Sequence, residues 1–294
     1  MRRPRIGLVL GGGGSRGLAH IGVLKVLARE QIPIDFIVAT SMGGIIGVMF
    51  ALGYHPAEIG QGVSRLQQSL LFSLKMLSAR ARQRQVLDNL TEFLGDKTFD
   101  DLAIPVTLMC VDMRHGCEVQ LQSGPLVPAL LATSAVPGAF PPVKLEGMEL
   151  ADGGVIDSLA THVAYEQGAE RVIAVDVYPA LDKDNPWADP ISRILGLQLP
   201  GAVFGLNGND EDKIPNLAAS LWRSVRVMTW YLHEQRLAAH PPDILLRPDV
   251  DRHASLDFRD IDTPVQAGVA EAERYLSELR ALAGGQQRIG KATN

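Results

Sequence analysis

One serine stands where a nucleophile could be displayed. Ser41 lies in residues 39–44 (ATSMGG), between an apolar run and a segment with helical spacing. A serine on such a strand-to-helix turn projects its hydroxyl away from the sheet. Ala39 and Gly43 are the small residues two positions before and after it, and they keep the turn free of clashes. Serine is also a common helix N-cap, so this turn alone does not decide between the two roles.

A serine hydroxyl needs a base. Seven histidines are present, but none stands in a glycine-framed turn. Asp152 does, because an apolar strand end delivers it directly before Gly153 and Gly154. An unperturbed aspartate has a pKa near ~3.9 and is a poor base, although in a dehydrated site it can accept a proton. A plain Asp-Gly-Gly turn explains the same spacing equally well.

A glycine run, residues 11–17 (GGGGSRG), separates the first apolar run from the first helical segment. It fits the G-x-G-x-x-G spacing of a dinucleotide site, but the acid nearest the required distance, Asp35, starts the second strand instead of ending it. No Gly-Lys-Ser/Thr follows, which excludes a P-loop. A third interpretation is an oxyanion hole, in which consecutive glycine amides point at a developing negative charge with a helix N-terminus behind them; a plain tight turn is the alternative.

The elements that must position these residues alternate between strand and helix. This alternation predicts a three-layer α/β/α fold with a mostly parallel central sheet. We expect strands at 6–10, 34–39, 104–111, 171–177 and 243–246, with 119–121 paired beside the third. We expect helices at 17–29, 42–52, 63–97, 125–133, 216–239 and 263–283.

Two local predictions follow from these helices. Thr263 and Pro264 suggest a capping box with proline at the first helical position. Arg80, Arg82 and Arg84 are expected on a solvated helix face.

We expect a single domain over residues 1–283, followed by a mobile tail at 284–294. Residues 180–215 interrupt the alternation with prolines, glycines and an apolar stretch at 191–204. Long irregular segments of this kind are often functional. Two interpretations of 191–204 stay open. It either covers the site or enters a lipid surface, giving peripheral membrane contact, or it packs on the core.

The bulk composition excludes several classes of protein. A net charge of −5 gives no support to a nucleic-acid partner. Cys110 and Cys117 fit neither a disulfide scaffold nor a zinc pattern, so we expect reduced thiols and a cytoplasmic location. No stretch reaches the roughly 18 apolar residues that span a bilayer.

Four segments, in this order, resemble motifs of the patatin-like phospholipase family: residues 12–17, 40–43, 132–142 and 152–154. The resemblance covers roughly residues 5–178. It implies a Ser41–Asp152 dyad that uses no histidine, metal or cofactor. The substrate it implies is an acyl ester of a lipid, chiefly a phospholipid or lysophospholipid.

The resemblance also assigns supporting residues. Gly12, Gly13 and Gly14 match the oxyanion glycines. Arg16 matches the basic residue of that turn, which is either structural or directed at an anionic group. Two departures concern geometry and substrate range: Ala39 replaces a glycine, and residues 157–160 (DSLA) stand where Asn and Pro are commoner.

Three alternatives compete with the dyad. The first is a Ser-His-Asp esterase that uses a late histidine such as His233 or His253. The second is a nucleotide-dependent oxidoreductase built on the glycine run. The third is a regulatory protein that keeps the motifs with little turnover.

Overall fold

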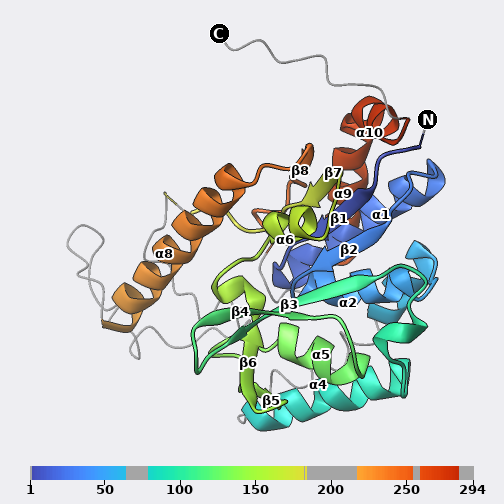
Figure 1. Cartoon of the computed structure of the whole chain (residues 1–294). Helices are drawn as coiled ribbons and strands as arrows, with labels where there is room; N and C mark the ends of the chain where they lie inside the picture. The colour runs from blue at the N-terminus through green and yellow to red at the C-terminus, as the bar shows by residue number, and fades with distance from the viewer. Residues whose placement is uncertain (1, 64–78, 182, 184–216, 254–258, 285–294) are drawn as a thin grey trace.

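The computed structural model describes residues 2–63, 79–181, 183, 217–253 and 259–284. An eight-stranded mixed sheet runs through the molecule, in the order β5-β6-β3-β2-β1-β7-β8, with β4 paired to β3 (Figure 1). Nearly all of the segment 180–215, its apolar stretch 191–204, and residues 285–294 lie outside the described residues.

Five strands of the sheet are parallel, as predicted. They are β1 (Ile6–Leu10), β2 (Phe36–Ala39), β3 (Val106–Asp112), β7 (Arg171–Val175) and β8 (Ile244–Leu246). Three more strands are antiparallel to their neighbours. β4 (Cys117–Leu121) and β6 (Met148–Asp152) both pair with β3, and β5 (Val143–Leu145) pairs with β6. The sequence predicted the pairing of β4 but not the β5–β6 hairpin.

Helices cover both faces of the sheet, which confirms the three layers. Side chains of β1 point alternately to the two faces of the sheet, so Leu8 and Leu10 belong to one hydrophobic core and Val9 to the other. The larger core lies under α1 (Ala19–Arg29), α2 (Met42–Ala51), α4 (Ala79–Leu94), α5 (Leu126–Thr133), α9 (Asp262–Arg274) and α10 (Leu276–Ala283). The smaller core lies under α6 (Thr161–Glu166) and the C-terminal part of α8 (Leu217–Ala239).

Helix ends differ from the predictions in two places. A 3-10 turn, Gly14–Leu18, precedes α1. The helix expected at 263–283 is two helices that meet at Tyr275, and Thr263 is not its N-cap. Instead, the Asp260 carboxylate accepts the Thr263 N–H at 3.0 Å. The N-cap residue is Ile261, which makes no side-chain capping bond, so the predicted capping box does not form.

Arg82 is also not where the sequence placed it. It is buried, and its guanidinium donates to the carbonyl oxygen of Ala139 at 2.8 Å. The neighbouring Gln83 donates to the carbonyl oxygen of Pro141 at 2.7 Å. The helix α4 therefore holds the irregular segment that precedes β5.

The pairing along β3 determines where the site forms. β4 runs along one side of β3, so β2 and β6 must share the other side. β2 ends with Ala39 opposite Leu108, and β6 ends with Asp152 opposite Cys110. The two strands therefore arrive end to end beside Met109, one from each direction.

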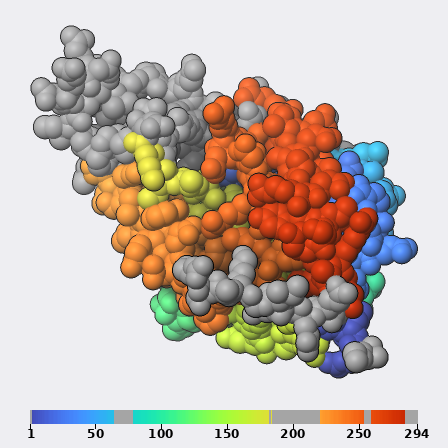
Figure 2. Space-filling view, turned by 90° about the horizontal axis from the view of Figure 1, so that it is seen from above, coloured from blue at the N-terminus to red at the C-terminus, as the bar shows by residue number. Residues whose placement is uncertain are grey.

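Three further findings concern the fold as a whole. Among the described residues, no helix is long and apolar enough to cross a membrane. Cys110 is buried and Cys117 is exposed, and both are free thiols, as expected. The C-terminal helices α9 and α10 lie beside the N-terminal segment of the chain (Figure 2).

Candidate active site

Ser41 lies between β2 and α2 in a conformation that serine rarely adopts. Its φ is 55° and its ψ is −124°, and the residue is buried. Such backbone angles cost about 1–3 kcal/mol and persist only where the surroundings impose them. Gly43 shows one of those constraints, because a Cβ there would lie 2.3 Å from the Leu10 carbonyl oxygen. The first turn of α2 is thus pressed against the end of β1.

Asp152, the last residue of β6, is also buried. Burial raises the pKa of its carboxyl to about 6, although hydrogen bonds from the Ser41 hydroxyl and the Gly154 amide oppose this rise. The Gly154 N–H lies 2.8 Å from the carboxylate oxygen. The side chain is therefore a stronger base than an ordinary aspartate.

The structure brings Ser41 and Asp152 together across the gap between β2 and β6. Gly153 permits this approach, because a Cβ there would lie 2.7 Å from the Met109 carbonyl oxygen. Ser41 makes no hydrogen bond to a histidine among the described residues.

The glycine run differs from the expectation in one respect. The Gly12 N–H donates to the Ser158 carbonyl oxygen at 3.0 Å, so Gly12 is not a free oxyanion donor. The Ser158 hydroxyl in turn donates to the Gly12 carbonyl oxygen at 2.9 Å. Within the described part of the chain, no acceptor takes the amides of Gly13 and Gly14, which leaves both available for an oxyanion.

His20 holds the start of the glycine run by a hydrogen bond, a role that the sequence did not reveal. Its side chain is fully buried on α1, and Nε2 donates to the Gly11 carbonyl oxygen at 2.8 Å. Burial lowers the pKa of His20 to about 4, so the ring is neutral at physiological pH. A polar residue on the apolar face of the first helix was the signal available in the sequence.

Thr133 was a second unrecognised residue, although it belongs to the 132–142 motif. Its hydroxyl accepts the Ser41 N–H at 3.0 Å and donates to the Met109 carbonyl oxygen at 2.6 Å. Two residues later, the Ala135 carbonyl oxygen accepts the Asp152 N–H at 3.1 Å. This motif therefore contacts both members of the candidate dyad.

Arg16 is directed toward the C-terminal part of the chain. It is buried, and its guanidinium donates to the His253 carbonyl oxygen at 2.9 Å. Burial, followed by the charge of Arg226, lowers the pKa of Arg16 to about 10. These contacts favour the structural alternative for Arg16.

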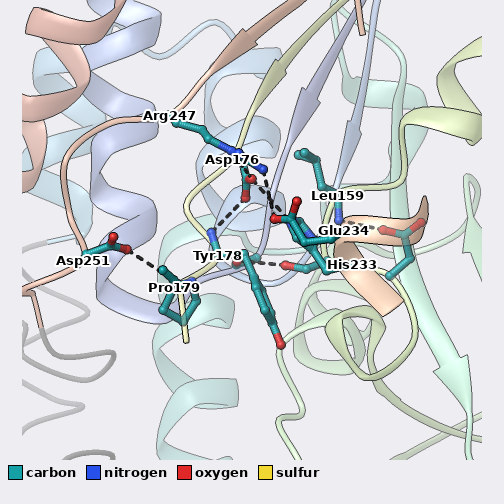
Figure 3. A network of polar contacts seen from close by, with 12 residues as sticks. Leu159, Asp176, Tyr178, Pro179, His233, Glu234, Arg247 and Asp251 are labelled. Atoms are coloured by element: carbon teal, nitrogen blue, oxygen red, sulfur yellow. Dashed lines mark hydrogen bonds and ion pairs between the residues drawn. The ribbon is translucent and has the colours of Figure 1, made fainter. Parts of the chain in front are cut away.

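A second buried network lies at the end of β7 (Figure 3). The Asp176 carboxylate accepts from His233 Nε2 at 3.2 Å and from Arg247 Nε at 2.9 Å. Burial raises the pKa of Asp176, but the hydrogen bond and charge of His233 outweigh it, so the pKa lies below its usual value. The His233 ring stacks on Tyr178, with ring centroids 4.6 Å apart. The hydrogen bond between His233 and Asp176 fixes α8 to the end of β7. Because His233 is bonded to Asp176 and not to Ser41, it gives no support to a Ser-His-Asp triad.

Asp35, the acid considered for a dinucleotide, is already engaged. Its carboxylate accepts from Arg3 at 2.6 Å and from the Ile6 N–H at 2.7 Å. It ties the chain start to β2 and is not available for a ribose hydroxyl.

A cluster of Glu118, Asp157 and His162 places potential metal ligands within 4.8 Å of one another. Arg236 already lies in this cluster, with its Nη1 at 2.5 Å from a Glu118 carboxylate oxygen and 3.3 Å from an Asp157 carboxylate oxygen. Hydrogen bonds to Asp157 and Glu118 raise the pKa of His162 to about 9, so the ring is protonated at pH 7 while it makes these contacts. The cluster is thus an ion-pair network.

The geometry can support acyl transfer. It combines a serine hydroxyl, a carboxyl with a pKa near neutrality and two unengaged amides beside a helix N-terminus. These are the nucleophile, the base and the oxyanion donors that ester hydrolysis requires.

The chain is similar to several known proteins. The model of the patatin-like phospholipase family matches residues 8–165. The chain is 31% identical over 285 residues to a lysophospholipase NTE1 of Yarrowia lipolytica, which covers 94% of this chain and 20% of that protein. It is 34% identical over 201 residues to an uncharacterised NTE family protein of Mycobacterium bovis, covering 65% and 56% of the two chains. The chain thus spans about a fifth of the former relative and about half of the latter.

Among solved structures, the chain is similar to VipD from Legionella pneumophila, with 11% identity and a TM-score of 0.40. That likeness covers 98% of this chain and 82% of VipD.

Proposed function

The chain belongs to the patatin-like phospholipase family, and on this premise we propose that it hydrolyses acyl esters of lipids with Ser41 as nucleophile and Asp152 as base. The observation that carries the proposal is the contact between the Ser41 hydroxyl and a buried carboxyl whose pKa is about 6. The NTE1 relative is named a lysophospholipase, which favours a phospholipid or lysophospholipid as the substrate.

In the proposed reaction, the Ser41 oxygen attacks the ester carbonyl while Asp152 accepts the hydroxyl proton. The amides of Gly13 and Gly14 stabilise the oxyanion of the tetrahedral intermediate. Asp152 then protonates the departing alcohol, which leaves the acyl group on Ser41. Asp152 next accepts a proton from water as that water attacks the acyl-enzyme. It returns this proton to the Ser41 oxygen as the bond between Ser41 and the acyl group breaks, so the fatty acid is released and the dyad is restored.

Hydrolysis of a chromogenic acyl ester and of a lysophospholipid tests the proposal. We expect Ser41→Ala and Asp152→Ala to lose activity on both substrates. Ser224→Ala and Asp96→Ala, which change the same residue types at exposed positions, should retain it. Turnover close to that of the unmodified protein in either dyad variant would refute the assignment. An inactive but folded unmodified protein would favour the regulatory alternative instead.

We also propose that the chain meets its substrate at a lipid surface. Several large apolar side chains of α8 are exposed: Leu221, Val225, Val227, Met228 and Tyr231. Exposed apolar side chains on one element are typical of surfaces that bind lipid or protein. Replacement of Leu221 and Met228 by serine should weaken sedimentation with phospholipid vesicles while hydrolysis of a water-soluble ester is unchanged. Unchanged sedimentation would count against this contact.

The cytoplasmic location expected from the cysteines stays a prediction.

A further inference from the structure

The last residue of α5 and the turn that follows it contact the two dyad residues through their backbones. The Ser41 N–H is held by the Thr133 hydroxyl at 3.0 Å, and the Asp152 N–H is held by the Ala135 carbonyl oxygen at 3.1 Å. The same hydroxyl is anchored to Met109, which lies between the ends of β2 and β6. One short segment thus holds the backbones of both the proposed nucleophile and the proposed base, and it is itself bonded to Met109 of β3.

The Ser41 N–H needs such a partner. Ser41 is buried and has a positive φ, so its amide cannot join the regular hydrogen bonding of β2 or α2. A buried N–H without an acceptor is unfavourable and would pull the backbone toward another conformation. Any relaxation of φ swings the Ser41 side chain away from Asp152.

We propose that Thr133 is a positioning residue: its hydroxyl fixes the strained backbone of Ser41 so that the side chain points at Asp152. This inference rests on the proposed function. It also means that the Ser41 amide is not an oxyanion donor, which leaves that role to Gly13 and Gly14.

The chemistry of the position limits which side chains can serve. The group must accept a hydrogen bond from an N–H and donate one to a carbonyl oxygen at the same time. A hydroxyl does both, whereas the isosteric valine does neither. Serine should therefore replace Thr133, and valine should not.

Steady-state kinetics on a water-soluble chromogenic ester tests the inference with three variants. We expect Thr133→Val to lower kcat by about a hundredfold with KM little changed, because misplacing a reacting group by about 1 Å has an effect of this size. Thr133→Ser should restore most of kcat. Thr107→Val is the matched control: Thr107 is also buried and accepts hydrogen bonds from Gln122 and Gln167, but it contacts neither dyad residue. It should keep the kcat of the unmodified protein once rates are normalised to the folded fraction.

Two results would overturn the positioning role. One is a Thr133→Val kcat equal to that of the unmodified protein. The other is a Thr133→Ser variant as impaired as Thr133→Val, since the methyl group and not the hydroxyl would then matter. Failure of the proposed function looks different, because Ser41→Ala would then hydrolyse the ester as fast as the unmodified protein, whatever residue stands at 133.

Discussion

In the proposed mechanism Asp152 accepts a proton although it is an aspartate, and its burial favours this role. The raised pKa of about 6 places the carboxyl much closer to the pH of the cell than an ordinary aspartate. The pKa stays below neutrality because the Ser41 hydroxyl and Gly154 N–H favour the charged form. At pH 7 most of the protein therefore has the base in its active, ionised state.

The pH dependence of hydrolysis follows from this value. Only the ionised Asp152 can accept the Ser41 proton, so kcat/KM should be level above pH 7. It should fall about tenfold for each pH unit well below pH 6. A rate profile from pH 4.5 to 9 measures this, with enzyme held at pH 4.5 and returned to pH 8 as the control for denaturation. A level profile down to pH 4.5 would exclude Asp152 as the base.

The same burial makes the ionised Asp152 carboxylate unfavourable for the free energy of folding. A pKa raised to about 6 from 3.8 means that the folded state favours the neutral carboxyl, so ionisation above pH 6 destabilises the fold by up to about 3 kcal/mol. Asp152→Asn should therefore raise the free energy of unfolding by about 1–3 kcal/mol at pH 8 while abolishing activity. Near pH 4, where the folded-state carboxyl is already neutral, this gain should be almost absent. Urea denaturation at both pH values measures it, and a variant that is less stable at pH 8 would contradict the cause given for the pKa.

At the scale of elements, the contact between α1 and α9 closes the larger core. The two helices approach through glycines, because a Cβ on Gly22 would lie 2.0 Å from the Val265 carbonyl oxygen. The reciprocal Cβ on Gly268 would lie 2.0 Å from the Ala19 carbonyl oxygen. α1 also carries His20, so its position affects the glycine run.

Gly22→Ala should lower the free energy of unfolding by about 3 kcal/mol, since the helices must move apart to admit the methyl group. Gly60→Ala is the control, because it adds the same methyl group to a helical residue with no atom within 4 Å of the new Cβ. That change should be neutral or stabilising by up to about 1 kcal/mol. Equal effects of the two substitutions on thermal unfolding would show that helix propensity, and not the close approach, decides.

Sequence patterns predicted the parallel strands and the turns that carry Ser41 and Asp152, because buried strands and glycine-framed turns leave local signals. They did not predict the partners that fix those turns. Thr133 and Ser158 act through hydrogen bonds to residues far away in the chain. The β5–β6 hairpin was missed because β5 and the first part of β6 are only partly buried, so neither leaves a continuous apolar run in the sequence. Arg82 was misplaced for a related reason: its carbonyl partner, Ala139, is not a helical neighbour.

At the scale of the whole molecule, an ion-pair network joins four parts of the chain. Glu118 comes from β4, Asp157 from the loop after the candidate base, His162 from α6 and Arg236 from α8. Two carboxylates and two cations balance in charge when His162 is protonated. The network therefore holds α8 against the loop that follows Asp152.

Arg236→Gln should destabilise the protein by about 1–2 kcal/mol, because the buried Asp157 loses one of its two cations while the exposed part of Arg236 weakens the effect. EDTA should leave the unfolding temperature of the unmodified protein unchanged. Thermal scans with and without EDTA measure both effects, and Arg223→Gln on the same helix is a suitable control. A fall in unfolding temperature with EDTA would show that the cluster binds a metal.

Covalent capture of the nucleophile tests the central claim most directly. A fluorophosphonate probe followed by peptide mass spectrometry should place the label on Ser41 in the unmodified protein. Labelling should be lost in Ser41→Ala and strongly slowed in Asp152→Asn. Rapid labelling at another serine, or undiminished labelling of Ser41 without the Asp152 carboxylate, would contradict a Ser41–Asp152 dyad.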